Sequence, residues 1–185
     1  AKGYNMISLA VNLGLAGAFQ TGMRYAYERG YLYAVQFDGD NQHSAEYVEL
    51  MKEEINRGAD IVIASRFLEK KKPLTLRMLG SRLIALAIRL TTGVKLTDPT
   101  SGMRMYSSKA IEEFALSINY APEPDTLSYL IKQGIRVSEM QAGMRERSGG
   151  ESYLTPVSSI KYMTRMLISI IFIQNFRKRN SKYLR

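Results

Sequence analysis

Tyr33-Ala-Val-Gln-Phe-Asp-Gly-Asp-Asn-Gln-His43 joins a short apolar segment to a turn that carries two carboxylates. We expect Tyr33–Phe37 to form a strand, because it is a short run of apolar and aromatic residues. In an extended chain Asp38 and Asp40 point to the same side, and Gly39 lets the backbone turn without a steric penalty. The stretch therefore predicts two carboxylates at the carboxyl end of a strand, where open α/β sheets usually bind ligands.

These two carboxylates admit two interpretations. With Gln42 or His43 nearby, their oxygen atoms suit Mg²⁺ or Mn²⁺, and such an ion could bridge a diphosphate and neutralise a leaving group. Alternatively, the acidic turn caps a helix that we expect to begin at Ser44. The residues alone leave both interpretations open.

Apolar runs on either side of this stretch alternate with amphipathic segments. Met6–Val11 and Asp60–Ser65 are short apolar runs that we expect to be strands. Leu15–Arg29 and the segment from Ser44 to Gly58 have apolar residues at helical spacing, and a glycine ends each. Three strands separated by helices predict right-handed crossovers and parallel pairing, so the fold class is α/β.

The second half of the chain continues the alternation and shows no internal repeat. Thr155 can cap a last helix, and Pro156 suits its first turn. We expect helices at Arg77–Thr92, Ser108–Leu116 and Thr126–Gln133, a strand within Ile135–Met144, and a final helix that runs to about Asn175.

The composition excludes several kinds of chemistry. The 185 residues include no cysteine and a single histidine, His43. Disulfides, thiolate metal sites and cysteine nucleophiles are therefore excluded, and a serine triad has only one candidate base, beside an acidic cluster. The absence of cysteine fits a reducing cytoplasm, and the length suffices for one domain with its own core.

The net charge of +9 is distributed unevenly. No acidic residue follows Glu151, and the apolar run Met166–Ile173 lies among basic residues. This combination suits an anionic bilayer interface, although a solvated tail is the alternative. The run is shorter than the ~20 residues of a membrane span, so we expect the chain to lie on a membrane. Nucleic acid ranks low, because aromatic residues do not alternate with basic ones in a stacking pattern.

Three further segments suit anions or proton transfer, and each has a structural alternative. Asn12–Gly17 could admit a phosphate to backbone amides or could form a tight turn. Within Thr97-Asp-Pro-Thr-Ser-Gly-Met-Arg104, Asp98 could orient or deprotonate a nucleophile and Arg104 could hold an anion, but the segment also fits an ordinary turn. Arg145-Glu-Arg-Ser-Gly-Gly-Glu-Ser152 could cradle phosphate or remain a solvated loop.

Five of these segments, in this order, resemble glycosyltransferase family 2, and within it the dolichol-phosphate mannose synthase and polyprenyl-phosphate glucosyltransferase branch. The resemblance extends from Asn12 to about Thr155 and depends on the combination, since each motif alone is common. It implies a GT-A fold with a mostly parallel sheet flanked by helices, and a metal-dependent inverting transfer from a UDP- or GDP-sugar. The segments are Asn12–Gly17, Gln36–His43, Ala64–Phe67, Thr97–Arg104 and Arg145–Ser152.

The resemblance implies roles on the donor side. Asp38, Asp40 and Gln42 match the motif that holds Mg²⁺ or Mn²⁺ together with the donor diphosphate, and Asp40 is counted as catalytic. Ser65 and Arg66 match the start of a loop that closes over the donor.

On the acceptor side, the resemblance makes Asp98 the candidate catalytic base. An acceptor such as polyprenyl or dolichyl phosphate is already largely ionised at neutral pH, so Asp98 would then position more than deprotonate. Glu123 and Asp125 match acidic positions of the family loosely. The residues expected to bind the acceptor are Ser101, Arg104, Arg145, Arg147 and Ser152.

The resemblance also divides the chain. Residues 1–155 would form the catalytic domain, and residues 156–185 a juxtamembrane amphipathic helix with a basic tail. The protein would be cytoplasmic and bound peripherally to the inner face of the membrane. Whether it forms a homo-oligomer stays open.

The beginning of the chain departs from the family pattern. Family members start with a strand and an Ile-Pro-x-x-Asn-Glu-like turn, whereas Met6–Val11 corresponds to a later strand. We therefore expect an exposed sheet edge and a half-built nucleotide pocket. Two rival functions stay open: a nucleotidyltransferase on the same type of sheet, and a non-catalytic basic module that binds membranes.

Overall fold

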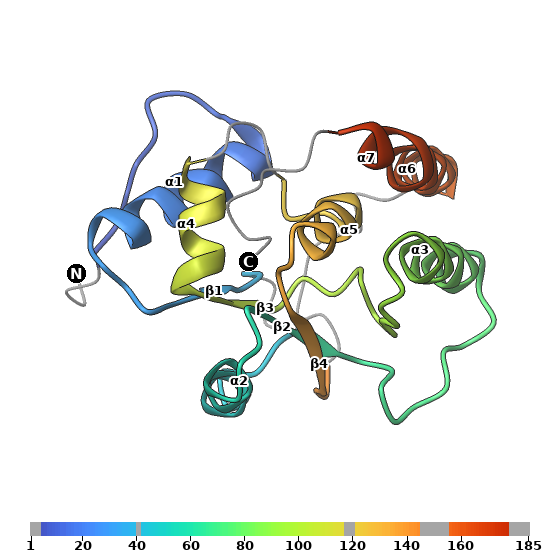
Figure 1. Cartoon of the computed structure of the whole chain (residues 1–185), viewed down its shortest axis with the longest axis horizontal. Helices are drawn as coiled ribbons and strands as arrows, with labels where there is room; N and C mark the ends of the chain where they lie inside the picture. Colours follow the sequence, from blue (N-terminus) through green and yellow to red (C-terminus); the bar gives the residue numbers. More distant parts are fainter. Residues whose placement is uncertain (1–4, 40–41, 117–120, 145–155, 178–185) are drawn as a thin grey trace.

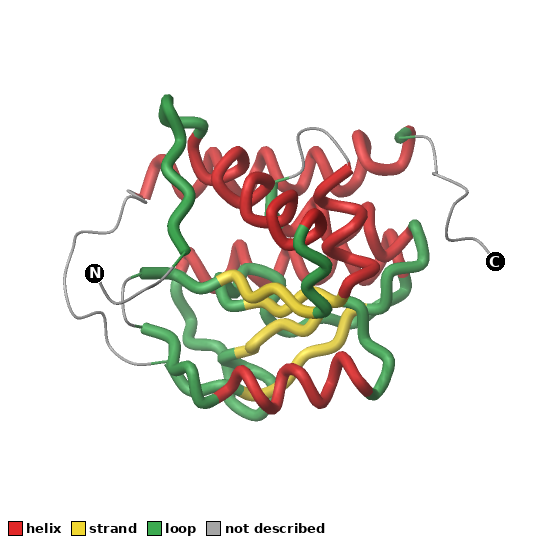
Figure 2. Tube along the Cα trace, turned by 90° about the vertical axis from the view of Figure 1, so that its left-hand side faces the viewer, coloured by secondary structure: helices red, strands yellow, loops and turns green. Residues whose placement is uncertain are grey.

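A four-stranded sheet lies between two layers of helices in the computed structural model (Figures 1 and 2). The structure describes residues 5–39, 42–116, 121–144 and 156–177. The α/β class predicted from the sequence is confirmed. The strands are β1 (Tyr33–Gln36), β2 (Ile61–Ser65), β3 (Arg104–Ser107) and β4 (Val137–Gln141). The helices are α1 (Gly14–Glu28), α2 (Tyr47–Asn56), α3 (Leu76–Thr92), α4 (Ser108–Leu116), α5 (Pro124–Lys132), α6 (Pro156–Ile168), the π-helix η1 (Ser169–Ile173) and α7 (Gln174–Phe176).

The sheet is mixed, with the strand order β1-β3-β2-β4. β3 pairs antiparallel with β1 and with β2, whereas β2 and β4 pair in parallel. β1, β2 and β4 therefore run in one direction, and β3 runs against them. The expected parallel pairing between the strands at residues 33–37 and 60–65 is wrong, because β3 lies between them.

The N-terminal segment does not form the strand predicted at Met6–Val11. These residues are irregular and exposed. An extended segment becomes a strand only by forming a hydrogen-bonded ladder, and no strand of the described ranges pairs with this one. β1 is accordingly an edge strand, with β3 as its hydrogen-bonded neighbour.

Two helix starts show where local signals worked and where they failed. α3 begins after Thr75, whose hydroxyl accepts a hydrogen bond from the Met78 amide at 3.2 Å. The predicted cap at Ser44 is wrong, because α2 starts at Tyr47 with Glu46 at the N-cap and no side-chain cap. The acidic turn therefore does not serve as a helix cap through Ser44.

Both faces of β2 are covered, and every one of its residues is buried. Ile61 and Ile63 pack with the layer that contains α1, α3, α4 and α5, whereas Val62 and Ala64 pack against α2. Figure 2 shows this arrangement, with α2 alone on one side of the sheet. Successive strand residues face opposite sides of the sheet, so both faces of β2 pack against helices. This packing fixes the position of the carboxyl end of β2.

The C-terminal helix packs on α3 and α5 (Figure 1). A Cβ at Gly80 of α3 would overlap the Met163 side chain of α6, so the two helices approach closely there. Met166 and Ile170 lie in the same core as Ile84 of α3. Among the described residues, no helix has the length and apolarity to cross a bilayer.

Candidate active site

Asp38, Arg66 and Asp98, three of the polar residues predicted from the sequence, lie at the edge of the sheet where β1, β2 and β4 end. Asp38 lies two residues beyond β1, and Arg66 directly follows β2. Arg104, the first residue of β3, pairs with Gln36 and with Ile63, so the preceding loop at residues 97–103 lies at the same edge. We call residues 97–103 the Asp98 loop.

The Asp38 carboxylate lies directly against Gly102 of the Asp98 loop. A Cβ at Gly102 would overlap this carboxylate, so a larger residue would displace it. Asp38 is exposed and Gln42 is half-buried, while Asp40 lies outside the described residues. In the described ranges, no group of three acidic or histidine side chains could hold a metal ion. The metal set of Asp38, Asp40 and Gln42 therefore stays a prediction.

Asp98 is fully buried and forms an ion pair with Arg66. The Nε and Nη2 atoms of Arg66 donate to its two carboxylate oxygens at 2.6 and 2.8 Å, and the hydroxyl of Thr100 donates at 3.1 Å. Burial opposes ionisation of Asp98, but the hydrogen bonds and charge of Arg66 outweigh it and hold the pKa of Asp98 below its usual value. Asp98 is therefore a bound carboxylate and a weak proton acceptor.

Glu139 of β4 holds the Asp98 loop from the other side. Its carboxylate accepts hydrogen bonds from the backbone amides of Thr97 and Asp98 at 2.5 and 2.6 Å, and from the Thr97 hydroxyl at 2.9 Å. Sequence patterns did not identify Glu139, since a single acidic residue in a strand carries no recognisable spacing. Its role is visible only when β4 lies beside β2.

Ser101 of the Asp98 loop and Arg104, the first residue of β3, were expected to bind the acceptor, but both are buried. The Ser101 hydroxyl donates to the Ala64 carbonyl at 2.6 Å. Arg104 donates to the carbonyls of Ser101 and Pro99 at 3.1 and 2.8 Å. Both side chains thus hold the loop against the sheet in this arrangement.

The segment after β2 brings two cationic side chains over one aromatic ring. The Arg66 guanidinium and the Lys72 ammonium lie 5.1 and 5.6 Å from the centre of the Phe67 ring. Lys72 also donates to the Ser81 hydroxyl of α3 at 2.9 Å. Burial lowers the pKa of Lys72 below its usual value, although the charge of Asp98 opposes this shift.

Glu123 and Asp125, the loosely matched acidic residues, connect α5 to the C-terminal helix. Arg165 donates to both oxygens of Glu123 at 2.9 and 3.0 Å, and Ser169 donates to Asp125 at 2.7 Å. Burial raises the pKa of Glu123, and the charge of Arg165 opposes the shift. These carboxylates hold α6 and η1 against α5, and α6 lies near Thr100 of the Asp98 loop.

Two predicted phosphate sites have different outcomes. At Asn12–Gly17, the Asn12 side chain accepts the Gly14 amide at 2.8 Å, which fits the tight-turn interpretation. Arg145, Arg147 and Ser152 lie outside the described residues, so their acceptor role stays a prediction.

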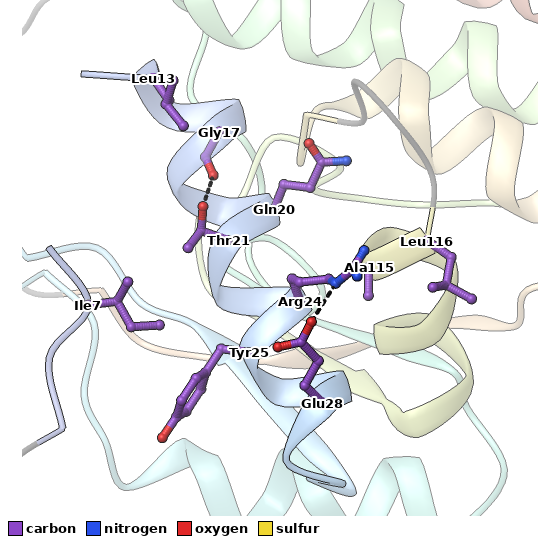
Figure 3. A pocket seen from close by; sticks show the side chains of 10 residues that line it. All are labelled: Ile7, Leu13, Gly17, Gln20, Thr21, Arg24, Tyr25, Glu28, Ala115 and Leu116. Atoms are coloured by element: carbon purple, nitrogen blue, oxygen red, sulfur yellow. Dashed lines mark hydrogen bonds and ion pairs between the residues drawn. The ribbon is translucent and has the colours of Figure 1, made fainter. Parts of the chain in front are cut away.

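A hollow of about 610 Å³ beside α1 is unrelated to these residues (Figure 3). It is lined by α1, Ile7 and the end of α4. The charged residues of its lining, Arg24 and Glu28, form an ion pair with each other at 2.7 Å. Because these two charges pair with each other, the described lining offers no unpaired charge to a phosphate or a metal, and the sheet edge is the better candidate.

Comparison with known proteins shows that this chain is similar to members of one family. Glycosyl transferase family 2 matches residues 1–115. The undecaprenyl-phosphate mannosyltransferase of Micrococcus luteus is 33% identical over 149 residues, which are 77% of this chain and 61% of that protein. The polyprenol monophosphomannose synthase of Mycolicibacterium smegmatis is 28% identical over 150 residues, which are 77% of this chain and 56% of that protein.

A third relative has a different sugar in its name. The UDP-N-acetylglucosamine–dolichyl-phosphate N-acetylglucosaminyltransferase of Methanococcus voltae is 34% identical over 106 residues, which are 55% of this chain and 42% of that protein. The chain thus spans between about two fifths and three fifths of the length of these relatives.

Proposed function

Because this chain belongs to glycosyl transferase family 2, we propose that it acts in the transfer of a sugar from a UDP- or GDP-sugar to a polyprenyl or dolichyl phosphate. Two of the relatives reported above have undecaprenyl phosphate or dolichyl phosphate in their names. One observation in the structure carries the proposal: the Asp38 carboxylate lies against the Asp98 loop at the carboxyl end of the sheet. This edge is where α/β sheets bind nucleotides and their sugars.

The predicted cation fits the donor side of this edge. Asp38, Asp40 and Gln42 would hold Mg²⁺ or Mn²⁺, since exposed carboxylate and amide oxygens are the ligands that these ions prefer. When bound, the ion would neutralise charge on the departing diphosphate. Gly102 keeps the Asp38 carboxylate at the rim, because no side chain competes for its position.

The state of Asp98 favours a phosphate as the acceptor. A sugar hydroxyl needs a general base, but the low pKa of Asp98 and its bonds to Arg66 and Thr100 make it a poor one. A lipid monophosphate, with a second pKa near ~6, is already nucleophilic at neutral pH. Asp98 would then hold Arg66 at the rim, where the guanidinium offsets repulsion between the two substrates.

The outer face of α3 supports a position on a membrane. Leu76, Leu79, Leu83, Leu86 and Leu90 form a single row on the helix, and their exposed fractions range from 44 to 77%. The adjacent C-terminal helix also has exposed apolar residues, Ile168, Phe172 and Phe176. Such a surface suits insertion into the interface of a bilayer.

The distribution of charge favours an anionic membrane as the partner of this surface. Residues 70–97 and 152–185 contain 14 of the 26 lysines and arginines and no aspartate or glutamate. A second copy of this chain would present the same positive face and would be repelled, whereas anionic lipids would be attracted. We therefore place the protein peripherally on the inner, cytoplasmic face of a membrane, where anionic headgroups concentrate.

Product analysis with the full-length protein tests the transfer. Incubation with doubly labelled UDP- and GDP-sugars, a polyprenyl phosphate and Mn²⁺ should give a lipid that carries the sugar label alone. A lipid that carries the nucleotide label would instead favour the nucleotidyltransferase. Asp38→Asn should lower the rate on the order of 100-fold with unchanged thermal unfolding. Full activity of this variant would overturn the role of Asp38.

A further inference from the structure

A hollow of about 340 Å³ lies where α1 ends, at the opposite end of β1 from Asp38. Its lining comes from the turn that joins α1 to β1 and from the start of α4. Tyr27, Tyr31 and Leu32 contribute its exposed apolar side chains, with exposed fractions of 41, 50 and 65%. We call these three residues the tyrosine patch. α1 and α4 lie on the left of Figure 1 and α3 and α6 on the right, so the patch is separate from the leucine row.

The turn that carries the tyrosine patch has a fixed shape. Gly30 ends α1 in the left-handed conformation, with a φ of +66°. The amides of Gly30 and Tyr31 donate back to the carbonyls of Tyr27 and Ala26 at 3.1 and 2.9 Å. The Tyr31 ring packs beside the Tyr25 ring, with 6.2 Å between the ring centres. Because these contacts already order Tyr31, a partner that covers it costs little conformational entropy.

The residues at the end of α1 are of the kinds that are enriched at protein interfaces. Besides the tyrosines, Arg29 follows α1, and its guanidinium lies 5.5 Å from the centre of the Tyr25 ring. A tyrosine ring buries a large apolar area, while its hydroxyl keeps a hydrogen bond. The tyrosine patch therefore has the composition of a contact with another protein surface.

The charges around the tyrosine patch balance, unlike those of the α3 face. Cations and carboxylates occur in equal number: Lys109 and Glu112 line the hollow, Arg29 and Glu28 lie at the end of α1, and Asp60 and Arg136 lie behind Lys109. In a two-fold symmetric pair each patch meets its own copy, so a patch with a large net charge would repel itself. This surface avoids such repulsion, and its charges of both signs can face their opposites across the axis.

We propose that the tyrosine patch is the contact between two copies of this chain, which meet about a two-fold axis at the end of α1. The inference goes beyond the proposed function and does not depend on it. The patch is small, so we expect a weak dimer with a Kd on the order of 10 µM. Because α3 lies on the other flank, the dimer leaves the leucine row of each copy open to a membrane.

Analytical ultracentrifugation of the full-length protein, at concentrations below and above that Kd, tests the contact. We expect a reversible equilibrium between monomer and dimer. Tyr31→Ser/Leu32→Ser removes two side chains of the patch and should weaken dimerisation at least tenfold. Leu50→Ser/Leu116→Ser, of similar exposure on α2 and α4, is the matched control and should change it less than twofold. A monomer at every concentration, or equal weakening by both doubles, would overturn the proposal.

Charge reversal tests the symmetry of the contact. Arg29→Glu makes the patch acidic and Glu112→Lys makes it basic, so each variant alone should dimerise at least tenfold more weakly. An equal mixture of the two should recover the dimer, because each acidic patch then meets a basic one. Arg57→Glu, the same change of charge on exposed α2, should dimerise like the wild type. A mixture that stays monomeric would overturn the two-fold arrangement.

The leucine row offers a second surface on which the copies could meet. Leu79→Ser/Leu86→Ser should keep wild-type dimerisation, because α3 is on the flank opposite the tyrosine patch. Loss of the dimer in this double, together with an intact dimer in Tyr31→Ser/Leu32→Ser, would place the contact on α3 and overturn the proposal.

Discussion

The Asp98 loop and the outer face of α3 use their polar and apolar groups in opposite ways. Asp98 and Ser101 of the loop, and Arg104 directly after it, are buried and bonded to the protein itself. On α3, a row of leucines and two cations, Arg77 and Arg89, are exposed. The loop has its own partners and can keep a fixed shape, whereas the α3 face requires a partner from outside. This contrast predicts that substitutions in the loop change folding stability, while substitutions on the face change binding.

The Arg66–Asp98 pair should give the largest effect on the free energy of unfolding. Arg66→Ala would leave the fully buried Asp98 without its charged partner and should cost about 3 kcal/mol. Urea unfolding followed by circular dichroism measures this. Arg24→Ala, which breaks the exposed pair with Glu28, is the matched control and should cost less than about 1 kcal/mol. Equal costs would show that the buried Arg66–Asp98 pair contributes no more to stability than the exposed Arg24–Glu28 pair.

Glu139 should rank second, because it accepts three hydrogen bonds from Thr97 and Asp98. Glu139→Gln should cost about 2 kcal/mol, since the new amide turns a donor toward backbone donors. If Glu139 positions the loop for transfer, kcat should fall while KM for the donor sugar stays near the wild-type value. Glu139→Asp, which keeps two acceptor oxygens, should recover part of both losses. A fall in stability without any change in kcat would make the role purely structural.

Acidification should weaken the loop and leave the α3 face unaffected. Because the folded pKa of Asp98 is lower than its unfolded pKa, its contribution is present above about pH 4 and is lost as pH falls through the folded pKa. Glu123, whose pKa is raised, has the opposite sign: its contribution is present below its unfolded pKa and lost as pH rises through the folded pKa. Measured unfolding free energies of the wild type should therefore fall toward low pH below about pH 4, where Asp98 becomes protonated, and not above it, where Glu123 acts in the opposite direction. Asp98→Asn should remove this component, and an unchanged slope would contradict the assignment.

The elements that the sequence predicted are those whose pattern is local. The helices near residues 15–29, 77–92 and 108–116 follow from apolar spacing, and the strand before Asp38 follows from its apolar run. β3 was missed for two reasons. It has only four residues, which directly follow a turn. It also begins with Arg104, a charged residue that is buried because it donates to carbonyls of the preceding loop. Met6–Val11 has the composition of a strand but no partner in the described ranges.

The candidate site divides in the same manner. Asp38, Arg66 and Asp98 were predicted and lie at one edge of the sheet. What the sequence did not reveal is which residues support the loop, because the partners of Ser101 and Glu139 come from segments distant in the chain. Burial therefore distinguishes residues that support the loop from those that could meet a ligand.

Gly102 should give a smaller effect on stability than the ionic residues, but a clear effect on the donor side. Gly102→Ala would push the Asp38 carboxylate from its place and should cost about 1 kcal/mol. Mn²⁺-dependent sugar transfer should fall at least tenfold, since the metal would lose one well-placed oxygen. Gly22→Ala on α1, where a Cβ meets no neighbouring atom, should leave transfer unchanged. Undiminished transfer by Gly102→Ala would show that the position of Asp38 against the loop is not needed for the reaction.

The leucine row should give the smallest effect on stability and thereby complete the contrast. Leu79→Ser/Leu86→Ser changes two exposed residues, so the free energy of unfolding should shift by less than about 1 kcal/mol. Affinity for phosphatidylglycerol vesicles, measured by sedimentation, should fall at least tenfold, because two side chains would no longer insert into the interface. Leu50→Ser/Leu116→Ser, equally exposed on α2 and α4, should keep wild-type affinity.

Substitution is a sharper test than removal of residues after Tyr153, since Met166 and Ile170 belong to the core and their loss would unfold the protein. If both leucine doubles lose the same affinity, the face of α3 has no special relation to the bilayer.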